Sequence, residues 1–105
     1  MTETPLTPRL AAKLAQLFTD DNLAFAERWL VTECGPNILG GFTDPIWVER
    51  VRAAALKVSN GSLDRLARTA ILAQGDWRDL LMAADFGSLN AHEAWLDERI
   101  AHRPA

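Results

Sequence analysis

His92 is the side chain best suited to acid–base chemistry in this sequence, because histidine changes its charge near neutral pH. It lies three residues before Trp95 and one turn before Leu96, on the half-buried face of an expected helix. Asp79 and Asp85 come from nearby elements, so an acid–histidine pair is conceivable. No nucleophile, metal-ligand set or phosphate-binding loop accompanies it, so we assign no catalytic residue. We expect a packed histidine with one hydrogen bond, and keep His92 and Asp79 as weak polar-site candidates.

Cys34 is the only cysteine, so an internal disulfide is excluded, and we interpret it as a small apolar filler near a helix end. No CxxC or Cys/His ligand cluster occurs, and we expect neither a metal site nor a cofactor. An acid stands near the N-terminus where a signal peptide requires a basic region. No apolar run approaches the ~18 residues that span a bilayer. These features predict a cytoplasmic protein that does not bind membranes.

Positive charge is concentrated in the middle of the chain, between residues 50 and 68, whereas residues 76–98 are mainly acidic. The simplest interpretation is two solvated helix faces that pair within the fold or across a dimer. The alternative is a surface that binds nucleic acid or phosphate, although the net charge of -3 opposes general affinity for nucleic acid. The candidates for this basic surface are Arg50, Arg52, Arg65 and Arg68.

Apolar side chains stand at two places where a monomer rarely exposes them, the loop 36–42 and an otherwise charged helix face. The simplest interpretation of the loop is that it folds over the open end of its own core, and a contact with a partner or ligand is the alternative. The chain also has four tryptophans and no tyrosine. Each tryptophan lies on or beside an apolar stripe, and tryptophan is enriched at interface hot spots, so we expect most in the core and one at a partner surface. The interface candidates are Ile38, Leu39, Phe42, Leu72 and Trp47.

Helical periodicity extends along nearly the whole chain, and no segment alternates as a strand would. The first expected helix has Thr7 as its N-cap and Pro8 at its first position. The second starts near Asp21 and ends at Gly35. The third runs from residue 44 to about residue 58 and is stopped by Asn60 and Gly61. Its charged residues are expected mainly toward water: Glu49, Arg50, Arg52 and Lys57.

Further cap signals divide the second half of the chain. Ser62 caps the fourth expected helix and Gly75 ends it, while Asp76 caps the fifth, so these two helices must turn tightly. Asn90 with Glu93 resembles a capping box and starts the last helix. A helix-turn-helix DNA-binding motif is disfavoured, because its second helix, which would enter the major groove, is acidic and would be repelled by the phosphates.

A sequence pattern in the last third of the chain resembles small uncharacterised bacterial helical proteins. Residues 76–87 read DWRDLLMAADFG and are followed by AHEAW at residues 91–95. The resemblance implies no activity. Helix caps, an aromatic anchor and a leucine pair would also explain these residue types.

Composition and length predict one domain over residues 1–105, since 49% of the residues are hydrophobic and 24% are charged. We expect an all-α fold, a compact bundle of about five to six short helices. A domain of this size buries only about two-thirds of its unfolded surface, so a homodimer would add stability. The leading function is a self-associating protein-interaction module of the adaptor or regulatory kind. Nucleic-acid or phosphate binding is the alternative, and a small enzyme is third.

Overall fold

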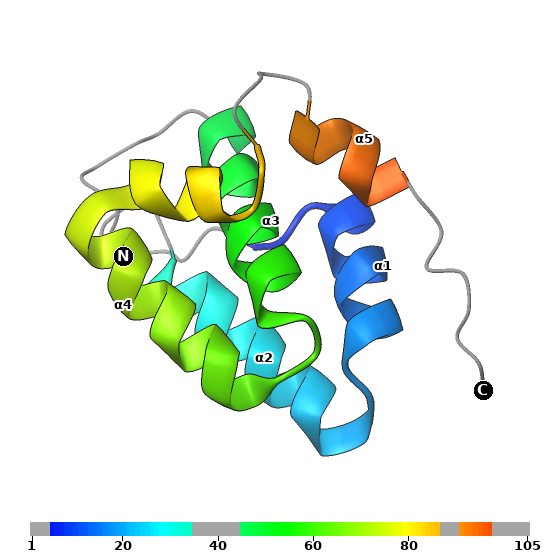
Figure 1. Cartoon of the computed structure of the whole chain (residues 1–105). Helices are drawn as coiled ribbons and strands as arrows, with labels where there is room; N and C mark the ends of the chain where they lie inside the picture. Colours follow the sequence, from blue (N-terminus) through cyan, green and yellow to red (C-terminus); the bar gives the residue numbers. More distant parts are fainter. Residues whose placement is uncertain (1–4, 35–44, 87–90, 98–105) are drawn as a thin grey trace.

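The computed structural model describes residues 5–34, 45–86 and 91–97. These ranges contain five helices and no strand, which confirms the all-α bundle. The helices are α1 (Pro8–Leu17), α2 (Asp20–Glu33), α3 (Pro45–Ser59), α4 (Leu63–Ala83) and α5 (Ala91–Asp97). Figure 1 shows α3 in the middle, with α4 on one side and α1 and α5 on the other. Helix α2 contacts both α1 and α4, and α3 also contacts both of them. Helices α1, α2, α4 and α3 therefore form a closed ring.

Local cap signals correctly located two helix starts. The Thr7 hydroxyl accepts a hydrogen bond from the Leu10 amide at 3.3 Å and begins α1. The Ser62 hydroxyl accepts from the Arg65 amide at 3.2 Å and begins α4. Each cap satisfies an amide that has no partner inside its own helix, and each involves residues only three positions apart.

The turn between α3 and α4 depends on Gly61, which has a φ of 84°. A Cβ atom there would lie 3.1 Å from the Leu17 carbonyl oxygen, whereas one at Gly75 would meet nothing within 4 Å. Gly61→Ala is therefore expected to lower the free energy of unfolding by about 1–2 kcal/mol. Gly75→Ala in α4 is expected to raise it by up to about 1 kcal/mol. Urea titration measures the free energy of unfolding of both variants. A change in the same direction for the two would contradict the conclusion that Gly61, and not Gly75, is required by the backbone.

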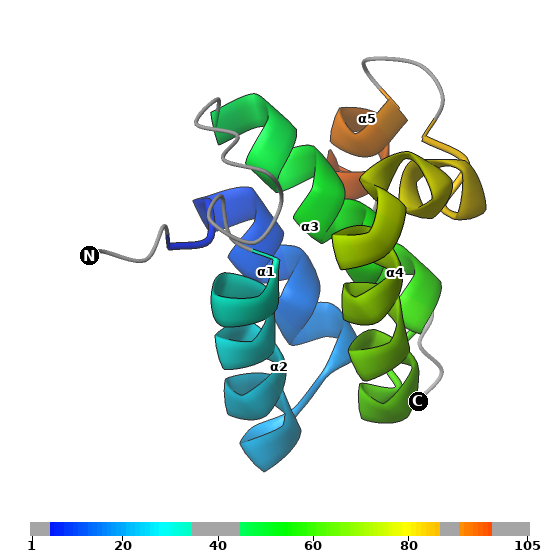
Figure 2. The ribbon, with the colours of Figure 1, turned by 90° about the vertical axis from the view of Figure 1, so that its left-hand side faces the viewer.

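Helix α4 continues for 21 residues through Gly75 and Asp76. The predicted helix end at Gly75 and N-cap at Asp76 are therefore wrong, and the helix-turn-helix interpretation has no turn. A glycine inside a helix costs only about 1 kcal/mol relative to alanine, and Gly75 is exposed, so no packing is lost there. The ribbon of α4 instead changes direction along its length (Figures 1 and 2).

The core of the molecule runs along α3, where every residue from Val48 to Leu56 is buried. A helix buried all round needs neighbours on all its faces, and here these are α1, α4 and α5. The predicted exposure of Glu49, Arg50 and Arg52 is therefore wrong. The run Ala53–Ala55 lets neighbouring backbones approach on several sides, and it is the local signal for this burial.

Candidate functional site

Arg52 joins α3 to the end of α2 and to the segment that precedes α1. Its side chain is 1% exposed. Its Nε donates to the Cys34 carbonyl at 3.1 Å, Nη2 to the Val31 carbonyl at 3.3 Å, and Nη1 to the Pro5 carbonyl at 3.2 Å. Two of these carbonyls belong to the last turn and C-cap of α2, which have no helical partners. Arg52 therefore caps α2 from another helix, with a charge that suits the helix dipole.

Two further cations of α3 satisfy the end of α4 in the same way. Arg50 Nη2 donates to the Phe86 carbonyl at 2.7 Å, and Lys57 Nζ donates to the Ala84 carbonyl at 2.8 Å. Ala84 is the C-cap of α4. Lys57 Nζ also lies 5.0 Å from the centroid of the Phe86 ring, which adds a cation–π contact.

The predicted basic surface is thus wrong for Arg50 and Arg52, which are buried. Arg65 and Arg68 are exposed, as a surface role requires. Arg68 Nη2 lies 3.2 Å from Asp64 Oδ2, so one of these two charges is partly neutralised. Three cations from the middle of the chain, Arg50, Arg52 and Lys57, therefore donate hydrogen bonds to backbone carbonyls at helix ends inside the fold.

Glu49 is the anionic centre of a buried polar cluster that joins three helices. Its side chain is 4% exposed, and Arg9 of α1 binds it through one edge of the guanidinium. Arg9 Nε donates to Oε2 at 3.0 Å and Nη2 to Oε1 at 2.8 Å, a bidentate geometry. The Thr7 hydroxyl also donates to Glu49. Arg9 Nη2 lies 3.2 Å from Glu93 Oε2, which attaches α5 to the same cluster.

His92 borders this cluster and is completely buried. Its Nε2 lies 3.4 Å from Glu49 Oε1, but neither ring nitrogen has a hydrogen-bond partner among the described residues. The expectation that His92 is packed in the core is confirmed, whereas the hydrogen bond that we expected for it is absent among the described residues. Its acidic neighbour is Glu49 of α3 and not Asp79, which is exposed on α4. Asp85 is exposed as well.

The two buried groups favour opposite charge states. Burial lowers the pKa of His92, and the negative charge of Glu49 opposes this only in part. Burial alone would raise the pKa of Glu49, but hydrogen bonds from Arg9 and Thr7 outweigh it and keep that pKa below its usual value. At neutral pH the cluster therefore contains an ionised Glu49 beside a neutral His92.

This arrangement resembles a general-base pair, but among the described residues His92 does not line the depression beside it. The depression of about 370 Å³ beside the cluster is lined by Thr7, Pro8, Arg9, Ile46 and Glu49, and His92 is not part of that lining. A catalytic histidine must reach the proton that it transfers. The cluster therefore supports a role in holding α1, α3 and α5 together.

Acidification should destabilise the protein through His92. The folded-state pKa of His92 is below the unfolded value of about 6.5. The neutral, buried imidazole therefore stabilises the fold fully above about pH 6.5. This stabilisation is lost as the pH falls below that value, because protonation of His92 favours the unfolded chain. Thermal or urea unfolding of His92→Gln between pH 7.5 and 5.5 is expected to show a shallower pH dependence than the parent. The slopes should differ by up to about 1.4 kcal/mol per pH unit. Parallel slopes would exclude this role, because Glu49 titrates below that window.

Cys34 offers no reactive alternative. It is fully buried, and burial raises its pKa to about 12, so the thiol stays protonated at neutral pH. Among the described residues, no group of three or more His, Cys, Asp or Glu side chains could hold a metal ion. No helix in the described ranges has the length and apolar character needed to cross a bilayer.

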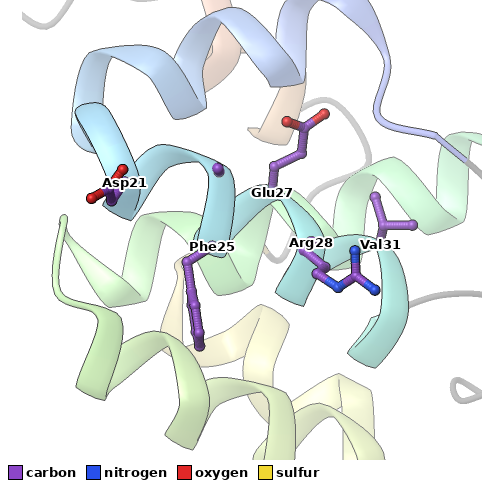
Figure 3. Close-up of a pocket in the computed structure, with 6 residues that line it drawn as sticks. Asp21, Phe25, Glu27, Arg28 and Val31 are labelled. Carbon is purple, nitrogen blue, oxygen red and sulfur yellow. The ribbon is translucent and has the colours of Figure 1, made fainter.

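The outer face of α2 is the other candidate site. We use this name for Asp21, Ala24, Phe25, Glu27, Arg28 and Val31, which line a depression of about 570 Å³. Phe25 is 57% exposed, and its ring stacks on Trp29 with the centroids 6.3 Å apart. Figure 3 shows Phe25 and Glu27 pointing to opposite sides of α2. An exposed aromatic thus borders a hollow whose edges carry charge.

Of the predicted interface residues, Trp47 is the one whose side chain the structure describes, and it does not line this face. Trp47 is half-buried, packs against the core and lies under the Arg50 guanidinium, 4.9 Å from its ring centroid. Ile38, Leu39, Phe42 and the side chain of Leu72 lie outside the described residues. Sequence reasoning missed Phe25, although a signal existed: Phe25 lies beside the α2 stripe formed by Leu23, Ala26 and Leu30, not within it.

No protein-family model matches this chain, and neither the curated proteins nor the solved structures contain a match. Any function therefore has to be supported by the two sites themselves. The Glu49 cluster pairs its charged groups with one another around a buried carboxylate, whereas the outer face of α2 presents apolar and charged groups to solvent.

Proposed function

We propose that this protein is an interaction module of the adaptor or regulatory kind, and that it self-associates through the outer face of α2. The observation that carries the proposal is the exposure of Phe25 beside a depression of about 570 Å³. Full burial of a phenylalanine side chain is worth about 1.5–3 kcal/mol, so a partner that covers Phe25 gains substantially. Aromatic residues in a central hollow are typical anchors of protein interfaces.

The surroundings of Phe25 support the same function. Stacking on Trp29 restricts the Phe25 ring before any partner arrives, which lowers the entropy lost on binding. Asp21, Glu27 and Arg28 line the same depression as the apolar residues, and charged groups at the rim of an apolar patch are common at interfaces. The internal use of Arg50 and Arg52 favours this function over phosphate binding, since it removes two of the four candidate cations from the surface.

Light scattering coupled to size exclusion tests the proposal over a dilution series. The parent is expected to approach twice the chain mass of 11.6 kDa at the highest concentrations. Phe25→Asp is expected to remain monomeric, because dimerisation would bury an unpaired carboxylate. Met82→Asp is the matched control, since Met82 is 73% exposed on α4 outside this face, and it should behave as the parent does.

Two outcomes would contradict the proposal. A parent mass of 11.6 kDa at every concentration would exclude self-association. A dimer that Phe25→Asp leaves intact would exclude the outer face of α2 as its interface. Circular dichroism of each variant verifies that the helical fold is retained.

A further inference from the structure

We infer that two copies pack their α2 helices antiparallel about a two-fold axis, with Asp21 of each copy paired to Arg28 of the other. This inference rests on the proposed self-association and names its geometry. The occupant of the outer face of α2 is then a second copy of the same chain. Three exposed residues follow one another along α2: the acid Asp21, the aromatic Phe25 and the base Arg28.

The register follows from the spacing of these residues. When two identical helices pack antiparallel about a two-fold axis, residues placed symmetrically around the axis face each other. The midpoint between Asp21 and Arg28 is also the midpoint between Ala24 and Phe25. One position of the axis therefore brings both Asp21–Arg28 contacts together and also sets each Phe25 against Ala24 of the second copy.

The sizes of the central side chains fit this arrangement. Ala24 lines the depression of the outer face of α2, and its small side chain leaves room above the helix. Phe25 of the second copy could enter that room, and Phe25 of the first copy would enter the equivalent room in return. A large residue set against a small one allows two helices to approach at the usual 8–10 Å between axes. A parallel arrangement would instead set like residues against each other, with acid facing acid and base facing base.

The charged side chains are available for this contact. Asp21 and Arg28 are exposed, and neither forms an ion pair within the described part of the chain. They lie two helical turns apart, on either side of the Ala24–Phe25 pair, so the two intermolecular pairs would flank the aromatic contact. Exposed ion pairs add little affinity, but they select orientation because the wrong register sets like charges together.

Charge reversal gives a test with an internal rescue. Asp21→Arg sets two arginines against each other at both contacts, and Arg28→Asp sets two acids against each other. Each variant alone is expected to dimerise about tenfold more weakly than the parent at low salt. An equimolar mixture of the two variants is expected to recover dimerisation to within about threefold of the parent, since every contact then joins opposite charges. The double variant Asp21→Arg/Arg28→Asp should recover it as well.

Matched controls separate pairing from a general change of charge. Asp79→Arg and Arg65→Asp make the same changes at exposed positions of α4, and both should dimerise as the parent does. Analytical ultracentrifugation at low and high salt measures each dissociation constant, and the differences should shrink as salt rises.

The possible results distinguish this inference from the proposed function. A monomeric parent overturns both. A parent dimer that Phe25→Asp disrupts but the charge reversals do not affect overturns the antiparallel register alone. Weakened single variants whose mixture fails to recover also overturn the register, because they show repulsion without the stated pairing. Recovery in the mixture, with unchanged controls, supports it.

Discussion

Arg52→Met is expected to lower the free energy of unfolding by about 3–5 kcal/mol, because it removes a buried charged cap from the end of α2. The guanidinium donates to three carbonyl oxygens, those of Pro5, Val31 and Cys34, and it is 1% exposed. Hydrogen bonds from a charged donor contribute about 1.5–3 kcal/mol each, although their sum is less than additive. Methionine fills much of the same volume and leaves all three carbonyls without this donor.

Urea titration of Arg52→Met against the parent measures the effect. Arg65→Met is the matched control, because Arg65 is exposed on α4, and it should change stability by less than about 0.5 kcal/mol. Amide hydrogen exchange should also lose protection first in the last turn of α2, whose carbonyls Arg52 caps. A loss below about 1 kcal/mol would mean that water replaces the cap without cost.

Arg9→Met is expected to lower the free energy of unfolding by about 3 kcal/mol, more than Glu49→Met does. The asymmetry comes from the exposure of the two partners: 40% for the Arg9 side chain and 4% for Glu49. Without Arg9, an ionised Glu49 stays buried with a single hydroxyl donor, which is costly. Without Glu49, Arg9 can turn to water and retain Glu93.

A double-mutant cycle tests this order. Arg9→Met/Glu49→Met should be more stable than Arg9→Met alone, because apolar replacement of both partners leaves no buried charge. The deficit of Arg9→Met should also narrow as the pH falls toward 4. The parent, whose Glu49 pKa is lowered, loses stability as that carboxylate is protonated, whereas the variant is relieved of its unpaired charge. A double variant less stable than Arg9→Met would refute the argument.

Short-range signals were sufficient for the helical class and for several helix ends. Thr7 and Ser62 cap α1 and α4, as expected, and Asn60 with Gly61 separates α3 from α4. Each of these signals involves groups within a few positions of one another, so the local sequence contains the whole interaction. The prediction failed at Gly75, where a local break worth about 1 kcal/mol competes with the continuity of a long helix.

The roles of the charged residues on α3 could not be predicted in the same way. Periodicity identifies which side chains share a helix face, but it does not show what covers that face. Arg50 reaches a carbonyl 36 positions away, and Glu49 accepts from a guanidinium 40 positions away. The charge pattern therefore indicated a basic surface, whereas packing placed those cations on helix ends.

The amino-acid order alone thus predicted the helical class and the caps that start two of the helices, because propensity, capping and apolar spacing act over a few residues. Tertiary packing decided the rest. It surrounded α3 with neighbours, brought Arg9 and His92 to Glu49, and left Phe25 uncovered on α2. The physical reason is that burial and charge pairing depend on which distant segments meet, and these contacts form only when the whole bundle closes.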